Sequence, residues 1–487
     1  MNTLNFLRSY KYEFVAFLTG ASVMVLEIVG ARLIAPTFGT SLYVWTAIIG
    51  VILGLLALGY WAGGLLADKR PDNTLVGSIL FAAALTVLLI SFTQEPLLNA
   101  IASFNLDLRL SAVIAALLLF GVPSFLIGMV SPHLAKIQVK SLEQTGRSIG
   151  RLEAAGALGS IIGTFSCGYF LLGLFGSRQI VIGVAGLLLL TSFIIDRHAW
   201  KGIRLFVVGI LLLGGIGIIN TSNPSNLLAD VDSSYTRYQV FGTLYNAVPV
   251  NILTTDRGGI QSAVPTNGSK ELVLSYVQHF YEAAERYGKP GKVLVVGGGT
   301  YTFPSALVDS FPTTAVDVVE IDPKLDELAR KHFEFKDNPR LTIHHQDGRT
   351  FINKNTGTYD LIYMDAFSSL SPPFQLTTLE ATERLKQNLS SDGVIVVNLI
   401  GNYLNNNDPY LRAVQTTYEQ TFDNVALYLA DPAARLSDGR QNFILYATNS
   451  DKTFAKITPD TAVSKVPFQQ TGQLLTDNFA PIEQLTY

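Results

Sequence analysis

The chain has 487 residues, of which 48% are hydrophobic and 15% charged, and its mean hydropathy is +0.32. This composition excludes an ordinary soluble enzyme, since such proteins carry about 25% charged residues. The formal net charge of −3 gives no indication of nucleic-acid binding, and the single cysteine, Cys167, excludes an intrachain disulfide.

The apolar residues are concentrated in the first 222 positions, which contain seven stretches long enough to cross a bilayer as helices. The first stretch is not a cleaved signal peptide, because it continues through Glu27 and Arg32 and no small-residue cleavage pattern follows it. We therefore expect an all-α, multi-pass transmembrane domain over residues 1–222, with the lipid bilayer as its partner and the plasma membrane as its location. The stretches lie at 13–35, 43–67, 75–94, 110–132, 152–175, 177–195 and 204–220.

Basic residues between these stretches are strongly biased to one side. Eleven lie on the side of the N-terminus, whereas the opposite loops contain only Arg109 and Arg178. The positive-inside rule therefore predicts a cytoplasmic N-terminus. Seven spans would then place the chain after residue 220 outside the cytoplasm. The eleven are Arg8, Lys11, Lys69, Arg70, Lys136, Lys140, Arg147, Arg151, Arg197, Lys201 and Arg204.

Small and ionisable residues inside the spans predict helix contacts. Glycines four residues apart let two helix backbones approach closely in lipid, and three such pairs occur at Gly50/Gly54, Gly59/Gly63 and Gly159/Gly163. Glu27 and Arg32 are costly at membrane depth, so they either pair with each other or with a group on another helix, or line a substrate path.

The composition of the chain changes at the Pro/Ser/Asn-rich sequence TSNPSN, which starts at residue 221. Short alternating strands with turn residues between them predict a small β-rich lead-in over residues 223–265. Over 266–487, buried-type strands then alternate with helices, which predicts a doubly wound, mostly parallel α/β sheet. A ligand of such a sheet binds at the carboxyl ends of its strands.

A glycine cluster closes the first of these strands. Gly297, Gly298 and Gly299 would let the backbone approach a ligand closely, and Glu320 ends the next strand, where an acid can accept hydrogen bonds from ribose hydroxyls. The sequence GGGTYTFP lacks the third glycine of dinucleotide sites, which favours a nucleoside without a pyrophosphate.

The following strands end in further polar residues. Asp347, with Gly348 beside it, lies where a carboxylate could accept from an adenine amino group. Asp365 ends the fourth strand and is suited to take a proton from an attacking amine or to steady a cationic substrate. His344 and His345 point to opposite strand faces and have no clustered third ligand, so no metal site is expected.

The ordered series VLVVGGG, VEID, QDGRTF and YDLIYMDAF resembles spermidine synthase, the polyamine aminopropyltransferase family, on a class I S-adenosylmethionine-type (Rossmann-like) fold. The helices ahead of it and the ending LTDNFAPIEQL are similar to the membrane-fused branch of that family. The resemblance implies aminopropyl transfer from decarboxylated S-adenosylmethionine, a nucleoside-sulfonium donor, to a primary amine such as putrescine. It also suggests a homodimer.

The resemblance implies a role for each motif residue. Asp365 would be the catalytic base, Glu320 would hold the ribose and Asp347 the adenine end. Gly297 to Gly299, Gly348 and Gln261 of RGGIQS would lie along the donor. Thr300 stands where the family has an acid that grips the donor's amino group.

Two other functions remain open from the sequence. A methyltransferase using S-adenosylmethionine itself would not need the acid that Thr300 replaces. A membrane transporter or sensor with a non-catalytic nucleoside-binding domain would use Glu27 and Arg32 to move a cation or metabolite.

Overall fold

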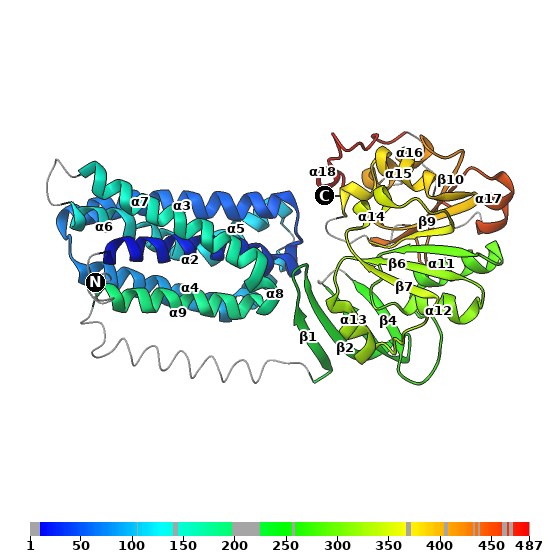
Figure 1. Cartoon of the computed structure of the whole chain (residues 1–487), viewed down its shortest axis with the longest axis horizontal. Coiled ribbons are helices and arrows are strands. Elements are labelled where there is room, and N and C mark those ends of the chain that lie inside the picture. The colour runs from blue at the N-terminus through cyan, green and yellow to red at the C-terminus, as the bar shows by residue number, and fades with distance from the viewer. Residues whose placement is uncertain are drawn as a thin grey trace. The chain divides into compact units, whose positions relative to one another are not determined.

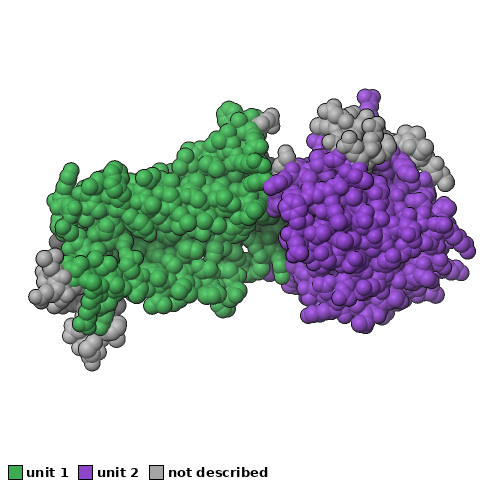
Figure 2. Space-filling model, turned by 90° about the horizontal axis from the view of Figure 1, so that it is seen from above, with its two compact units in different colours: residues 1–225, 231–237 green, residues 226–230, 238–487 purple. Residues whose placement is uncertain are grey.

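The computed structural model describes residues 10–104, 106–139, 145–196, 225–255, 259–366, 372–403, 408–431, 434–436, 439–459, 465–466 and 471–486. The chain divides into two compact units, coloured separately in Figure 2. Unit 1 comprises residues 1–225 and 231–237, and unit 2 comprises residues 226–230 and 238–487.

Unit 1 is a bundle of long apolar helices (Figure 1). Within the described residues, six helical segments are long and apolar enough to cross a membrane, and they correspond to the first six predicted spans. The seventh predicted span, 204–220, lies outside the described residues. The helices are α2 (Lys11–Phe38), α3 (Leu42–Lys69), α4 (Asn73–Ser103), α5 (Leu108–Gly128) continued by α6 (Val130–Gln138), α7 (Thr145–Ser166) continued by the π-helical turn η2 (Cys167–Leu171) and α8 (Leu172–Leu174), and α9 (Ser177–Ile195).

Glycines mark the closest helix contacts in the bundle. A Cβ atom at Gly63 would lie 2.6 Å from the Met129 Cα, and one at Gly163 would lie 2.6 Å from the Ala21 carbonyl oxygen. Gly59 and Gly159 abut neighbouring backbone in the same way, so both predicted pairs are confirmed. The prediction for Gly50 and Gly54 is wrong for the part of the chain that the structure describes, because none of its other elements has an atom within 4 Å of either Cβ position.

Polar side chains join the helix ends. The buried carboxylate of Glu13 accepts from the Gln138 side chain at 2.8 Å and pairs with Arg151 at 2.6 Å, which ties α2 to α6 and α7. Farther along α2, the Arg32 guanidinium donates to the backbone carbonyl of Ser234, so this charge has a polar partner.

The described chain from Asn226 onward forms two sheets. The lead-in is a four-stranded sheet in the order β1-β2-β3-β4, as the alternating pattern predicts. Its strands are β1 (Leu227–Asp232), β2 (Arg237–Tyr245), β3 (Val248–Thr254) and β4 (Ile260–Pro265).

The second sheet has seven strands in the order β10-β11-β9-β8-β5-β6-β7. The pairs from β9 through β7 are parallel, and β11 runs antiparallel to both β9 and β10. The fold is therefore Rossmann-like α/β, as predicted. The strands are β5 (Lys292–Val296), β6 (Ala315–Glu320), β7 (Leu341–His345), β8 (Tyr359–Met364), β9 (Leu389–Asn402), β10 (Asn424–Leu429) and β11 (Arg440–Thr448).

Both faces of this sheet are covered, which explains why its central strands are continuously apolar. In β5, Val293 and Val295 join one core, whereas Leu294 and Val296 join the other. The helices of unit 2 are α11 (Ser275–Tyr287), α12 (Thr302–Ser310), α13 (Lys324–His332), α14 (Gly348–Lys354), η4 (Phe374–Leu376), α15 (Leu379–Gln387), α16 (Pro409–Glu419), α17 (Asp451–Ile457) and α18 (Ile482–Thr486).

We predict that Gly159→Ala destabilises the bundle by about 1–3 kcal/mol, because the added methyl group would overlap the Phe17 backbone of α2. Gly54→Ala is the matched control, since its added methyl group meets no other element among the residues that the structure describes. Thermal unfolding of the full chain in detergent measures both effects. Equal melting temperatures for the two variants would contradict the assigned α2–α7 contact.

Candidate active site

The candidate site lies at the carboxyl edge of the seven-stranded sheet, where the strand order changes direction. From β5 the chain proceeds through β6 and β7 on one side, and then returns to β8 on the other side of β5. Such a switch point leaves a crevice between two loops that diverge from adjacent strands. Here the loops after β5 and β8 carry the glycine cluster and Asp365.

The glycine turn requires glycine for two reasons. Gly297 has φ 96°, a conformation that favours glycine, and its Cβ position would lie 2.5 Å from the Asp365 carbonyl oxygen. The backbone N–H groups of Gly298 and Gly299 both donate to the Glu320 carboxylate, at 2.9 and 3.2 Å. The turn and the acid that the sequence places at neighbouring strand ends are therefore in direct contact.

Glu320 is a buried acid, with 7% of its surface exposed. Burial raises the pKa of its carboxyl, and the backbone N–H donors of Asp322, Gly298 and Gly299 offset part of that rise. The carboxylate accepts from the Asp322 N–H at 3.0 Å through its other oxygen. Asp322 thus contributes to this end of the site through its backbone.

Strand β4 supports the turn from the lead-in sheet. The Thr300 N–H donates to the Ser262 hydroxyl at 3.2 Å, which brings β4 against the end of the glycine turn. Thr300 is completely buried, and no described residue gives its hydroxyl a hydrogen-bond partner. The neighbouring Gln261 takes part through its backbone carbonyl, which accepts from the Tyr276 hydroxyl at 3.0 Å.

Asp347 begins α14. Its Oδ1 atom accepts from the Thr350 N–H at 2.8 Å, which is the normal bond of an N-cap residue. Gly348 follows, and its Cβ position would lie only 2.8 Å from the Val296 side chain at the end of β5. The loop after β7 therefore contacts the strand that leads into the glycine turn.

Asp365 lies at the end of β8 within a chain of hydrogen bonds. Loss of contact with water raises the pKa of its carboxyl to about 7, although the Asn398 amide and the nearby Tyr276 hydroxyl act in the opposite direction. The Asn398 amide donates to Asp365 at 2.9 Å and in turn accepts from Asn442 at 2.9 Å. An acid with a pKa near neutrality is suited to exchange protons with a reacting group.

Sequence reasoning missed Asn398 and Asn442. Asn398 had a detectable signal, since an amide inside the apolar run GVIVVNLI must find a partner when the strand is buried. Asn442 had none, because its strand β11 was not predicted.

The paired histidines serve separate contacts, consistent with their opposite strand faces. His344 lies 3.2 Å from Asp317, and His345 lies 3.2 Å from Asp326. Over the described part of the chain, no group of three or more His, Cys, Asp or Glu side chains is placed to hold a metal ion.

The C-terminal region is similar to known proteins. Residues 271–456 match the family described as spermine/spermidine synthase domain. The polyamine aminopropyltransferase of Vibrio vulnificus (strain CMCP6) is 35% identical over 133 residues, which are 26% of this chain and 44% of that protein. The eEF1A lysine and N-terminal methyltransferase of Homo sapiens is 27% identical over 198 residues, which are 38% of this chain and 26% of that protein.

Among solved structures, the probable spermidine synthase from Corynebacterium glutamicum ATCC 13032 aligns with a TM-score of 0.40 at 20% identity. The alignment covers 50% of this chain and 90% of that one. The chain spans less than half the length of the two curated relatives described above.

We predict that Asn398→Ala moves the titration midpoint of Asp365 upward by roughly one pH unit, because the carboxylate loses a hydrogen bond that favours its charged form. The carboxyl stretching band in infrared spectra, assigned by its loss in Asp365→Asn, reports this titration. Asn442→Ala is the control, since it is one hydrogen bond removed from Asp365 and should shift the midpoint less. A midpoint unchanged in Asn398→Ala would contradict the assigned contact.

Proposed function

We propose that the spermine/spermidine synthase domain of this chain transfers an aminopropyl group from decarboxylated S-adenosylmethionine to a primary amine such as putrescine. The observation that carries this proposal is the position of Asp365, a half-buried acid whose backbone carbonyl abuts Gly297 of the glycine turn. The similarity to a protein named polyamine aminopropyltransferase supports the same class of reaction.

The proposed step is an in-line displacement. The amine nitrogen forms a bond to the aminopropyl carbon as the bond from that carbon to sulfur breaks. The bonding electron pair goes to sulfur, so the sulfonium leaves as neutral methylthioadenosine. The proton released by the amine passes to the Asp365 carboxylate. The protein therefore acts mainly by alignment and proton removal.

Donor binding is assigned to the residues around the glycine turn. Glu320 would accept from a ribose hydroxyl, because a carboxylate has about four acceptor positions and the three backbone N–H groups leave about one of them open. Asp347 would accept from the adenine amino group through Oδ2, since Oδ1 caps α14. The buried hydroxyl of Thr300 and the backbone at Gln261 and Gly348 complete the proposed donor site.

We predict that the purified full chain releases methylthioadenosine from decarboxylated S-adenosylmethionine in the presence of a diamine, and that Asp365→Asn lowers kcat by about 100-fold or more. Because only the deprotonated base accepts a proton, kcat/KM should rise as the pH increases through about 7, the pKa of Asp365. Mass spectrometry of both products over a pH series measures each effect.

Asp309→Asn is the matched control, because Asp309 is exposed and forms an ion pair with the surface residue Lys270. S-adenosylhomocysteine formed from S-adenosylmethionine would indicate a methyltransferase instead. Absence of all transfer products with every amine in a diamine panel would overturn the proposed reaction.

We also propose that unit 1 spans the membrane with its N-terminus in the cytoplasm. Three basic residues from the predicted cytoplasmic side lie at one end of the bundle: Lys11 donates to the Ile195 carbonyl, Lys136 pairs with Asp68, and Arg151 pairs with Glu13. This end would face the cytoplasm by the positive-inside rule.

Residues 231–237 of unit 1 support an outward exit of the chain from the bundle. Asp232 accepts from the N–H of Ser177, the first residue of α9, whereas Lys11 contacts Ile195 at the last residue of the same helix. The segment 231–237 therefore lies at the end of the bundle remote from Lys11. Unit 2 continues from it at Tyr238.

We therefore predict that alkaline phosphatase fused after Tyr487 is active outside the cytoplasm, and that a fluorescent reporter fused there is dark. A reporter fused at the N-terminus should give the cytoplasmic signal and serves as the internal control. A cytoplasmic signal from the C-terminal fusion would contradict this topology.

A further inference from the structure

The C-terminal sequence LTDNF, residues 475–479, forms a compact turn on unit 2. The N–H groups of Thr476 and Phe479 donate to each other's carbonyls at 3.1 and 3.0 Å. Leu475 is completely buried, and its carbonyl accepts from the N–H of Leu379, the first residue of α15. The turn therefore presents Asp477 from a fixed backbone.

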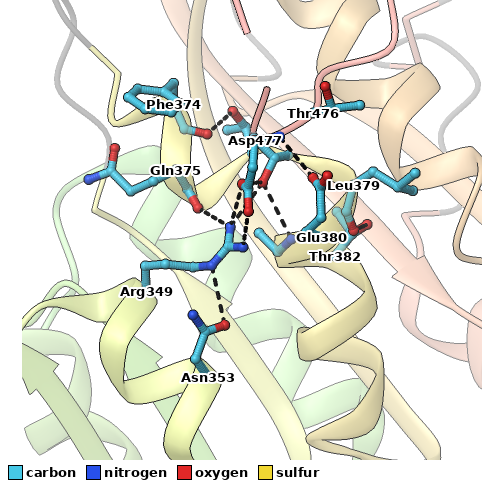
Figure 3. A network of polar contacts seen from close by, with 12 residues as sticks. Arg349, Asn353, Phe374, Gln375, Leu379, Glu380, Thr382, Thr476 and Asp477 are labelled. Carbon is cyan, nitrogen blue, oxygen red and sulfur yellow. Dashed lines mark hydrogen bonds and ion pairs between the residues drawn. The ribbon is translucent and has the colours of Figure 1, made fainter. Parts of the chain in front are cut away.

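Asp477 is the centre of a polar network (Figure 3). Its Oδ2 atom accepts from Arg349 at 2.7 Å, and its Oδ1 atom accepts from Arg349 at 3.1 Å and from the Thr378 hydroxyl at 2.7 Å. Its backbone N–H donates to Glu380 at 2.9 Å. A two-bond contact between guanidinium and carboxylate is both strong and directional.

Arg349 extends the network toward the proposed donor site. It follows Asp347 and Gly348 directly in the chain, and it donates to the Gln375 carbonyl of η4 at 2.7 Å. Only 14% of its side chain is exposed, so its charge depends on these partners.

Segment η4 also contacts the start of α14, at Gly348. Its residue Leu376 is buried, and a side-chain carbon of Leu376 lies 3.6 Å from the Gly348 Cβ position. The network thus holds two neighbours of Gly348. Arg349 is the next residue in the chain, and Leu376 packs against Gly348. Displacement of either would move the loop that carries Asp347.

We propose that residues 475–479 form a latch that sets the geometry of the nucleoside end of the donor site, with Asp477 as the positioning residue. The identity of the ligand rests on the proposed function. Asp477 acts through Arg349 and η4 and has no part in the chemical step.

The test uses Asp477→Asn in the full chain in detergent, with Arg349→Lys as a second variant that keeps the charge but loses the two-bond contact. The dissociation constant for methylthioadenosine and the KM for the donor should rise by about tenfold, whereas kcat should stay within about twofold. The pH midpoint should stay near 7, because Asp365 keeps its neighbours. Calorimetry and steady-state kinetics measure these values.

The control is Asp309→Asn, which breaks an exposed ion pair with Lys270. The nitrogen–oxygen distance of that pair, 2.9 Å, is close to the 2.7 Å between Arg349 and Asp477. Hydrogen exchange should become faster in Asp477→Asn at residues 348–354 and 374–380, and should not change there in Asp309→Asn. A general loss of stability would instead lower kcat or accelerate exchange across the whole sheet.

Wild-type methylthioadenosine affinity in both Asp477→Asn and Arg349→Lys would overturn the latch. If the wild-type chain binds no methylthioadenosine, the proposed function fails, and the exchange experiment alone decides the latch. Faster exchange confined to the two segments would then support it, and unchanged exchange would overturn it.

Discussion

The pairing of β5 with β8 is the constraint on which the rest of the site depends. Val296 and Met364 are in register as the last residues of the two strands, and the Asp365 N–H donates to the Val296 carbonyl at 2.7 Å. This bond holds the start of the loop after β8 directly against Gly297, where no side chain fits. The glycine turn thereby faces Glu320, and two backbone N–H groups of the turn donate to the Glu320 carboxylate.

Burial then divides the roles of the two acids. Both carboxyl groups have pKa values raised mainly by loss of water, and the charge of Glu320 adds to the rise at Asp365. Glu320 is surrounded by three backbone donors, which suits a residue that orients hydroxyl groups. Asp365 has an amide and a phenol as neighbours and titrates near 7, which suits a residue that takes up a proton.

Much of the fold follows from local patterns. Continuous apolar strands such as β5 are predictable because both of their faces are buried. Strand β11 was not predicted. It lies between β9 and β10 and runs antiparallel to both, and this placement depends on which strand edges of the sheet remain unpaired. The glycine pairs show the same limit: Gly50/Gly54 and Gly159/Gly163 have identical spacing, yet among the described helices only the second pair has a neighbour.

The sequence by itself determined the apolar helices, the α/β class and the order of the glycine turn, Glu320, Asp347 and Asp365 at successive strand ends, because periodicity and strand parity are local properties. Only the tertiary structure decided which distant groups support these residues. Asn398 reaches Asp365 across paired strands, and Asp477 reaches Arg349 over 128 positions of the chain. Such hydrogen-bond partners are brought together by sheet order and helix packing. No regular separation in the sequence links them, so they cannot be inferred from the sequence.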